Sequence, residues 1–396
     1  MLDRARPGGW KLAAESRPTI AARALKLLRM CRPVVLVALV TISAGAMSAG
    51  RATLDPLERT AVDSTRLTRS VILAVTDAGG RLVAVGERGQ ILLSDDNGAA
   101  WRQAKVPVSV TLTAVRFATP SQGWAVGHFG VVLHTEDGGE SWVMQLDGTR
   151  AGQLAYEYFD ARKPGANGNM ALAKEQLAAA AQLRDDGPDK PFLDLYFENA
   201  TTGFIVGAYD LIFRTQDGGK TWQPWQDRIA NPRGLHLNGI VGAGSDIFVA
   251  GEQGSFFRST DRGESFAALP TPYTGSYFGL VRVGNGDLII FGLRGNAFRS
   301  SDQGATWLRV ETNTTASITA GILLRDGSVA LVTQAAQILL SEDQGRSFRA
   351  LAVEGSGPLA GISQMPDGRL SVVGTRGIRS VSLPVGTRNA SLDSTK

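Results

Sequence analysis

Short segments in which apolar and polar residues alternate recur along most of the chain, in pairs joined by a turn that usually contains glycine. The two-residue period and the many β-branched residues predict β-strands. A third candidate strand precedes each pair, as in TLTAVRFA and YFGLVRV, and a fourth follows all but the last. Units of four strands predict an all-β protein. The seven pairs occupy residues 81–94, 123–135, 203–215, 246–259, 287–300, 328–341 and 369–382.

The pattern Ser/Thr-x-Asp-x-Gly-x-x-Trp/Phe, the Asp-box, ends the first six of these pairs. Successive aspartates are 41, 80, 44, 41 and 41 residues apart, a repeat length typical of β-propeller blades. The repeats therefore predict a seven-bladed β-propeller of four-stranded antiparallel blades. The six copies are Ser94, Asp96, Gly98, Trp101; Thr135, Asp137, Gly139, Trp142; Thr215, Asp217, Gly219, Trp222; Ser259, Asp261, Gly263, Phe266; Ser300, Asp302, Gly304, Trp307; and Ser341, Asp343, Gly345, Phe348.

The residue types of the box suit a tight turn between two strands. Asp and Ser/Thr side chains accept hydrogen bonds from backbone N–H groups that the turn leaves unpaired. Glycine permits a positive φ, and the aromatic residue opens the next strand, where a large ring can fill the space between blades. A metal-binding or catalytic role for the six aspartates is the alternative. Turn formation already explains all four positions, so we interpret the boxes as structural.

The seventh unit begins near Leu359 and ends without a box or an outer strand. Propellers commonly close when the start of the chain supplies the strand that its end lacks. We therefore expect residues 54–66 to complete the last blade. The predicted domain organisation is a leader over residues 1–50, a propeller over 54–386 and a disordered tail over 387–396.

The 80-residue step between the second and third boxes is the main irregularity of the repeat. Two blades, one of them degenerate, would explain it, but residues 148–190 contain no strand alternation. The stretch NMALAKEQLAAAAQLR is rich in strong helix formers, with Asn167 or Asn169 as an N-cap, and AGQLAYEYFDARK predicts a second short helix. We predict a helical insertion between blades 2 and 3. A loop of this length in a compact fold is more often functional than not.

Strand order predicts where binding occurs. If the strands of a blade run up and down, the turn between the second and third strands shares a face with the links between blades, and the Asp-boxes lie on the opposite face. The insertion, as a link, belongs with those turns. We predict a partner-binding rim there, although any single residue of it also fits an ordinary solvated turn. The rim residues are Arg88, His128, Tyr209, Glu252, Arg294 and Arg376.

The net charge of +4 belongs to the leader. Of 41 Lys/Arg and 37 Asp/Glu, eight and two lie in residues 1–50, which leaves 33 and 35 in the remainder, a net charge of −2. This balance gives no support to nucleic-acid binding. An uncharged stretch over residues 33–50, with Ala44 and Ala46 in an Ala-x-Ala arrangement, predicts either a cleaved signal peptide or a membrane anchor. Cys31 precedes it and forms no lipobox.

The repeated unit, as in GAYDLIFRTQDGGKTW and GEQGSFFRSTDRGESF, resembles the photosystem II assembly and stability factor family of seven-bladed propellers and its bacterial relatives, over roughly residues 68–383. The resemblance implies a non-enzymatic exported factor, without a cofactor, that holds a membrane protein during assembly through a surface containing arginines. It implies a periplasmic location, or the thylakoid lumen in a photosynthetic host, and otherwise an envelope or transporter-associated role. Arg214, Arg258 and Arg299 match the repeat but are expected on the box face.

A glycan-binding or glycoside-hydrolysing propeller is the alternative function, because sialidases also carry Asp-boxes. Their N-terminal Arg-Ile-Pro motif is absent here, but a pair of facing carboxylates would suffice for other glycosidases. The candidates in the insertion are Glu157, Asp160, Asp185 and Asp186. The histidines, His128, His134 and His236, have no metal-ligand spacing, so no metal site is predicted.

Overall fold

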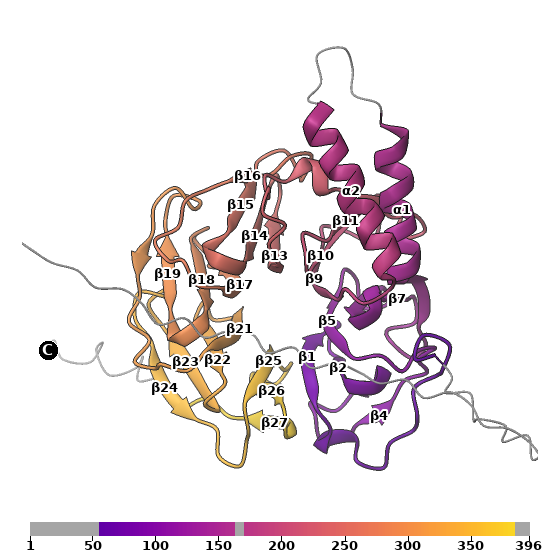
Figure 1. The fold of residues 1–396 in the computed structure, drawn as a ribbon. Coiled ribbons are helices and arrows are strands. Elements are labelled where there is room, and N and C mark those ends of the chain that lie inside the picture. The colour runs from indigo at the N-terminus through magenta and orange to yellow at the C-terminus, as the bar shows by residue number, and fades with distance from the viewer. Residues whose placement is uncertain (1–54, 163–169, 385–396) are drawn as a thin grey trace, which may run out of the picture. The chain divides into compact units, whose positions relative to one another are not determined.

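The computed structural model describes residues 55–162 and 170–384. Within them, seven antiparallel sheets are arranged around a central axis (Figure 1). The innermost strand of each sheet packs against the innermost strands of both neighbours, and that of the last sheet packs against that of the first. The predicted seven-bladed β-propeller is confirmed. The leader over residues 1–50 and the tail over 387–396 lie outside the described residues.

Blades 1 to 6 have four strands each and blade 7 has three, in chain order from the axis outward. Blades 1 to 3 are formed by β1 Ile72–Asp77, β2 Leu82–Gly86, β3 Ile91–Ser94, β4 Arg102–Gln103; β5 Leu112–Phe117, β6 Gly123–Gly127, β7 Val132–Thr135, β8 Val143–Leu146; and β9 Phe192–Phe197, β10 Gly203–Gly207, β11 Ile212–Thr215, β12 Gln223–Pro224. Blades 4 to 7 are formed by β13 Leu237–Ala243, β14 Asp246–Gly251, β15 Phe256–Ser259, β16 Ala267–Ala268; β17 Tyr277–Arg282, β18 Leu288–Gly292, β19 Ala297–Ser300, β20 Leu308–Arg309; β21 Ile318–Leu323, β22 Val329–Thr333, β23 Gln337–Ser341, β24 Arg349–Ala352; and β25 Leu359–Gln364, β26 Leu370–Gly374, β27 Gly377–Val381.

All six Asp-boxes form the same set of hydrogen bonds. In blade 4 the buried Ser259 hydroxyl donates to Asp261 Oδ1 at 2.7 Å and accepts from the backbone N–H of Gly263 at 2.7 Å. Asp261 also accepts from the backbone N–H of Ser265 at 3.0 Å and from its hydroxyl at 2.6 Å. The other five boxes repeat the first three bonds, a pattern that fits a structural role for the box.

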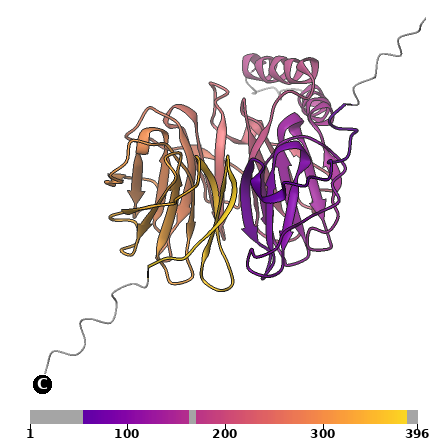
Figure 2. The same cartoon turned by 90° about the horizontal axis from the view of Figure 1, so that it is seen from below.

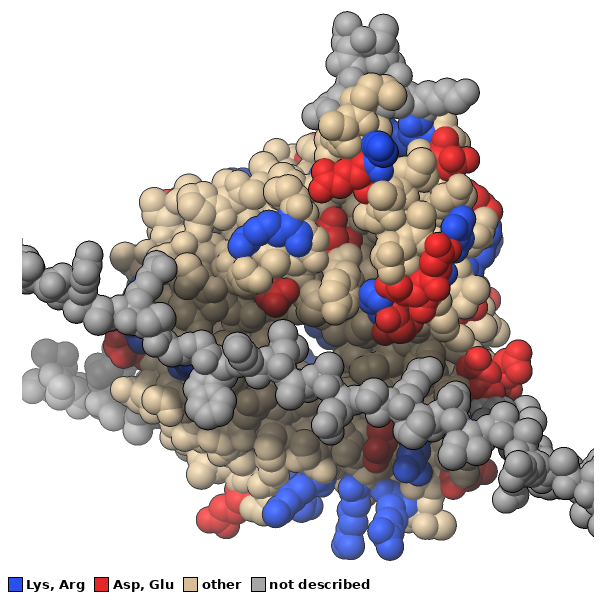
Figure 3. Space-filling view, viewed as in Figure 1, with Lys and Arg blue, Asp and Glu red and all other residues tan. Residues whose placement is uncertain are grey.

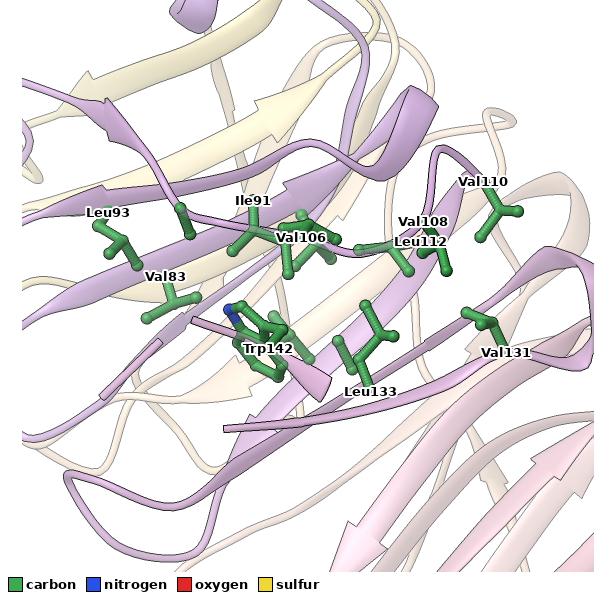
Figure 4. Close-up of a cluster of buried hydrophobic side chains, with 14 of the residues drawn as sticks. Val83, Ile91, Leu93, Val106, Val108, Val110, Leu112, Val131, Leu133 and Trp142 are labelled. Carbon is green, nitrogen blue, oxygen red and sulfur yellow. The ribbon is translucent and has the colours of Figure 1, made fainter. Parts of the chain in front are cut away.

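The box aromatics fill the contacts between blades, as predicted. Trp142 of blade 2 packs among Val83, Ile91 and Leu93 of blade 1 (Figure 4). Trp222, Phe266 and Phe348 join clusters shared with the preceding blade in the same way, and Trp307 meets Phe256 edge to face at 5.1 Å. Trp101 joins blade 1 to blade 7, in a cluster with Val373 and Ile378. Side-chain packing of this kind therefore also closes the ring.

The expectation that residues 54–66 complete the last blade is wrong for the part of that segment that the structure describes. Ala61 N–H donates to Val106 O at 3.1 Å, and Ser109 N–H donates to Pro56 O at 2.8 Å. The segment thus lies along the edge of blade 1 and its link to blade 2, and blade 7 keeps three strands. The physical reason is that this polar segment has little strand character and finds backbone partners in the adjacent link instead.

The insertion is helical, as predicted. Helix α1 covers Gly148–Ala161 and helix α2 covers Met170–Asp186, and the two helices pack against each other (Figure 1). Helix α1 begins earlier than the sequence suggests because Asp147 caps it, accepting from Arg150 N–H at 2.9 Å. The Asn167 and Asn169 caps proposed for α2 lie outside the described residues. Gly152 lets the helices approach, since a Cβ there would lie 2.8 Å from Arg184 Cα.

Replacement of a box hydroxyl should destabilise the whole propeller. Ser259→Ala leaves the buried Gly263 N–H without its acceptor, and we expect a loss of about 1–3 kcal/mol in the free energy of unfolding, measured with urea. Ser245→Ala, in an exposed turn of the same blade, is the matched control and should change stability little. Equal stability of the two variants would contradict the role given to the hydroxyl.

The boxes should also make stability fall in acid. Hydrogen bonds from the turns lower the pKa of all six box aspartates, that of Asp302 and Asp343 to about 2. A lowered folded-state pKa contributes stability that is complete above the usual value of 3.8 and is lost as pH falls toward 2. We expect this slope in urea unfolding between pH 5 and 2, and a shallower slope for Asp343→Asn. An identical slope in that variant would contradict the assignment.

Candidate functional site

The helical insertion lies on the face formed by the turns between second and third strands. Gly130, in the β6–β7 turn, touches the start of α1 so closely that a Cβ there would lie 2.6 Å from Gly148 Cα. The same turns contact the links between blades: Gly89 N–H donates to Val110 O at 2.6 Å and Gly254 N–H donates to Gly275 O at 2.8 Å. Figure 2 shows both helices at one end of the propeller. The predicted placement of the insertion is therefore correct.

The six predicted rim residues lie in these turns, in six different blades. Arg88, Tyr209 and Arg294 are exposed and adopt left-handed backbone angles, with φ of 56°, 52° and 57°. His128 and Arg376 are exposed as well. A residue at such a turn apex projects into solvent without contributing to the core, so these five side chains are accessible to a partner.

Glu252, the sixth rim residue, is half-buried. Its carboxylate accepts from the backbone N–H of His236 at 3.4 Å, just as Glu87 in blade 1 accepts from the backbone N–H of Val71 at 3.2 Å. In both blades this hydrogen bond links the turn to the residue just before the first strand of the same blade. Glu252 is therefore held by the fold, unlike the other rim residues.

This face carries a cleft of about 1110 Å³ between the helical pair, the β10–β11 turn and the link over residues 226–236. Of the predicted rim residues it includes only Tyr209. Acidic and basic side chains alternate over the helices beside it (Figure 3). Its charged lining residues are Glu175, Asp186, Lys190, Asp210, Asp227, Arg228 and Arg233, and its apolar ones include Phe159, Leu172, Leu183, Leu211, Ile229 and Pro232.

Asp227 holds helix α1 against the link at one side of the cleft. Its carboxylate pairs with Arg162 Nη1 at 2.8 Å and Arg228 Nε at 3.6 Å, and accepts from the Tyr158 hydroxyl at 3.2 Å. Burial, followed by the nearby charge of Asp227, raises the pKa of the Tyr158 hydroxyl, so this phenol stays a donor. The cluster fixes the C-terminal end of α1.

Asp210 lies at the base of the cleft with φ of 62°. Its Oδ1 accepts from Asn231 Nδ2 at 2.7 Å, and Asn231 in turn bridges to both backbone groups of Leu235. Burial raises the pKa of Asp210 to about 8, although the Asn231 bond acts in the opposite direction. Beside it, Lys190 Nζ lies 5.2 Å from the centre of the Tyr209 ring.

Sequence reasoning missed most of this cleft, including Asp210, Asp227 and Asn231. One signal for it was present, because the aspartate-to-aspartate step across the 226–236 link is 44 residues where three others are 41. That extra length forms one wall of the cleft. The residues that line it come from separate segments of the chain, so the sequence does not reveal which of their side chains meet.

The three arginines that precede boxes form ion pairs within the propeller. Arg214, in blade 3, pairs with Glu264 of the blade 4 box at 2.7 Å. Arg258 pairs with Asp246 at 2.8 Å within blade 4, and Arg299 pairs with Asp287 within blade 5.

The carboxylates considered for glycosidase chemistry do not form an isolated pair. Glu157 contacts Arg150, Asp185 contacts Arg184 and Asp186 contacts Lys190, at 3.6, 2.8 and 3.0 Å. Asp160 is exposed on α1. Among residues 55–162 and 170–384 there is no group of three or more His, Cys, Asp or Glu that could hold a metal. Across the same two ranges, no helix has the length and apolar content to cross a bilayer.

A family model described as Photosynthesis system II assembly factor YCF48 matches residues 63–157 and 181–320. The chain belongs to this family. The gap in the match falls inside the helical insertion. The chain is 29% identical over 168 residues to the photosystem II assembly protein Ycf48 of Synechococcus sp. (strain JA-2-3B'a(2-13)), which covers 40% of this chain and 49% of that protein.

A second relative is the photosystem II assembly lipoprotein Ycf48 of Synechococcus sp. (strain CC9902), 31% identical over 77 residues, or 19% of this chain and 23% of that protein. The matches thus span about half of these curated relatives or less. Among solved structures, YCF48 bound to D1 peptide matches with a TM-score of 0.57 and 17% identity, over 83% of this chain and 98% of that chain. At this identity the likeness concerns the fold.

Removal of the Asp227 carboxylate should loosen the insertion without unfolding the propeller. Asp227→Ala leaves Arg162 and Tyr158 without their shared acceptor, and we expect amide exchange in α1 to rise about tenfold or more, consistent with a loss of roughly 1.5–3 kcal/mol. Asp185→Ala, which removes a more exposed carboxylate beside Arg184, is the control. Unchanged exchange in α1 would show that Asp227 does not anchor the helix.

Proposed function

We propose that this protein is a binding factor that assists the assembly or stability of a membrane protein complex. Membership of the YCF48 family supports this proposal, and so does the likeness in fold to a solved structure of YCF48 bound to D1 peptide. The observation that carries the proposal to this chain is the cleft of about 1110 Å³, on the face that the Asp-boxes leave free. In a photosynthetic host the client would be a photosystem II subunit, and elsewhere an envelope or transporter protein.

The client would bind across the rim and the cleft. The exposed arginines Arg88, Arg294 and Arg376 offer cations around one face, and Tyr209 adds an aromatic ring that is 62% exposed. Arginine and tyrosine suit partner binding because one side chain combines apolar area with hydrogen bonding. We propose that the rim makes the first contacts and that the cleft receives one segment of the client.

We propose that binding takes place outside the cytoplasm and without catalysis. The basic and then apolar leader supports export, and one relative is named a lipoprotein. Three carboxylates of the insertion form ion pairs, namely Glu157, Asp185 and Asp186. These pairs support a role of the insertion in binding a partner and not in catalysis. A general acid would instead need a carboxyl that faces a second one across a cleft.

A charge reversal on the rim tests the proposal. Arg88, Arg294 and Arg376 changed together to Glu should greatly reduce copurification of integral membrane proteins with the full-length chain from its host, because the repulsive charges replace attractive ones over the whole rim. Lys220, Arg262 and Arg346 lie in Asp-box turns on the opposite face and are exposed. Their triple change to Glu is the matched control and should preserve copurification. Equal losses in both variants, or none in either, would contradict binding at the rim.

A further inference from the structure

The cations around the cleft all have partners, whereas one carboxyl group largely buried in its wall, that of Asp210, has no cationic partner among the described residues. Lys190 pairs with Asp186 at 3.0 Å and with Asp189 at 2.6 Å, and Arg228 contacts Asp227 at 3.6 Å. Arg233 Nη1 donates to Gln253 Oε1 at 2.9 Å. Asp210, in contrast, forms no ion pair with any residue that the structure describes, and Asn231 is the partner of its Oδ1.

A second acceptor in the cleft also lacks a donor. Gln226 Oε1 is buried and has no hydrogen-bond partner within the described part of the chain. Buried acceptors are normally satisfied, so this oxygen is available to accept a hydrogen bond from a ligand in the cleft. Glu175, on the exposed side of α2, adds a third acceptor without an ion pair among the described residues.

The walls around these acceptors are apolar. Phe159 and Leu183 come from the helices, and Leu211, Ile229 and Pro232 come from the propeller. A small hydrated cation would leave these walls exposed to water. A peptide segment would cover them, and the cleft volume of about 1110 Å³ exceeds the range of typical small-molecule pockets, about 300–1000 Å³.

We propose that the cleft binds an extended client segment in which one lysine or arginine is flanked by apolar residues, with the cationic group paired to Asp210. The flanking side chains lie against the apolar walls, and the same cationic group, or a backbone N–H next to it, donates to Gln226 Oε1. This inference rests on the proposed function and adds to it the chemistry of the segment. The rim arginines would then contact other, acidic parts of the client.

Binding of this kind depends on pH. In the free protein burial raises the pKa of Asp210 to about 8, so a cation must displace a proton at neutral pH. Affinity should therefore increase as pH rises toward 8 and stay level above it. The charged and titratable groups that face the site from every side are Glu175 and Asp186 on α2, Lys190 before β9, Asp227, Arg228 and Arg233 in the link, and Tyr209 with its neighbour His236.

Calorimetric titration of the full-length chain with two capped peptides tests the proposal. The probes are acetyl-Ala-Leu-Lys-Leu-Ala-amide and the analogue with norleucine in place of lysine. At pH 8 we expect the lysine peptide to bind at least tenfold more tightly, and its Kd to rise about tenfold or more from pH 8 to pH 6. Asp210→Asn, which preserves the shape of the side chain and its tolerance of positive φ, should abolish this preference.

Two control variants separate the site from its surroundings. Asp185→Asn removes a nearby carboxylate that does not line the cleft, and His236→Asn removes the adjacent imidazole. Both should keep the preference for lysine and its pH dependence. Equal binding of the two peptides, no binding of either, an unchanged preference in Asp210→Asn, or affinity that falls above pH 8 would overturn the proposal. Unchanged client copurification by Asp210→Asn would overturn it as well, while leaving the proposed function intact.

Discussion

A buried hydroxyl at the start of each Asp-box is the interaction on which the arrangement of the blades depends. It donates to the box aspartate and accepts from the glycine N–H, which fixes a turn whose aromatic residue then packs against the preceding blade. Because this geometry recurs in six turns on one face, the residues of that face serve mainly to stabilise the contacts between blades. The helical insertion lies on the opposite face, where the turns between second and third strands contain no Asp-box among the described residues.

The repeat in the sequence specified much of this fold, because each box combines a turn, a glycine and an aromatic whose physical roles are local. The order of the strands within a blade then predicted correctly on which face of the propeller the insertion lies. The way in which the ring closes was harder to predict from the sequence. Residues 54–66 have weak strand character, and no local pattern distinguishes pairing with blade 7 from pairing with the edge of blade 1. Helix α1 begins before the predicted segment because Asp147 caps it. Apart from this cap, the residues at its start have the pattern of a loop.

The candidate site was predicted only in outline. Arg88 and Arg294 stand out because they are charged residues at turn apexes, whereas Asp210 and Asp227 become neighbours of the helices only through folding. Glu252 differs from the other rim residues because its carboxylate also accepts a hydrogen bond from the backbone of its own blade, which a sequence pattern does not reveal. The two longest box-to-box steps, 80 and 44 residues, are consecutive in the chain, and the segments that lengthen them form opposite walls of one cleft. The family model leaves out residues 158–180 of the helical wall, whereas the opposite wall lies within the matched residues 181–320.

The central claim is that clients bind on the face that carries the cleft. Amine cross-linking of the full-length chain to its copurified client, followed by mass spectrometry, tests this claim most directly. Lys174 is exposed on α2, one of the two helices that form a wall of the cleft, and Lys220 is exposed in an Asp-box turn on the other face. We expect cross-links to the client from Lys174, with Lys220 linked little or not at all. Cross-links that gather at Lys220 and are missing from Lys174 would contradict the account.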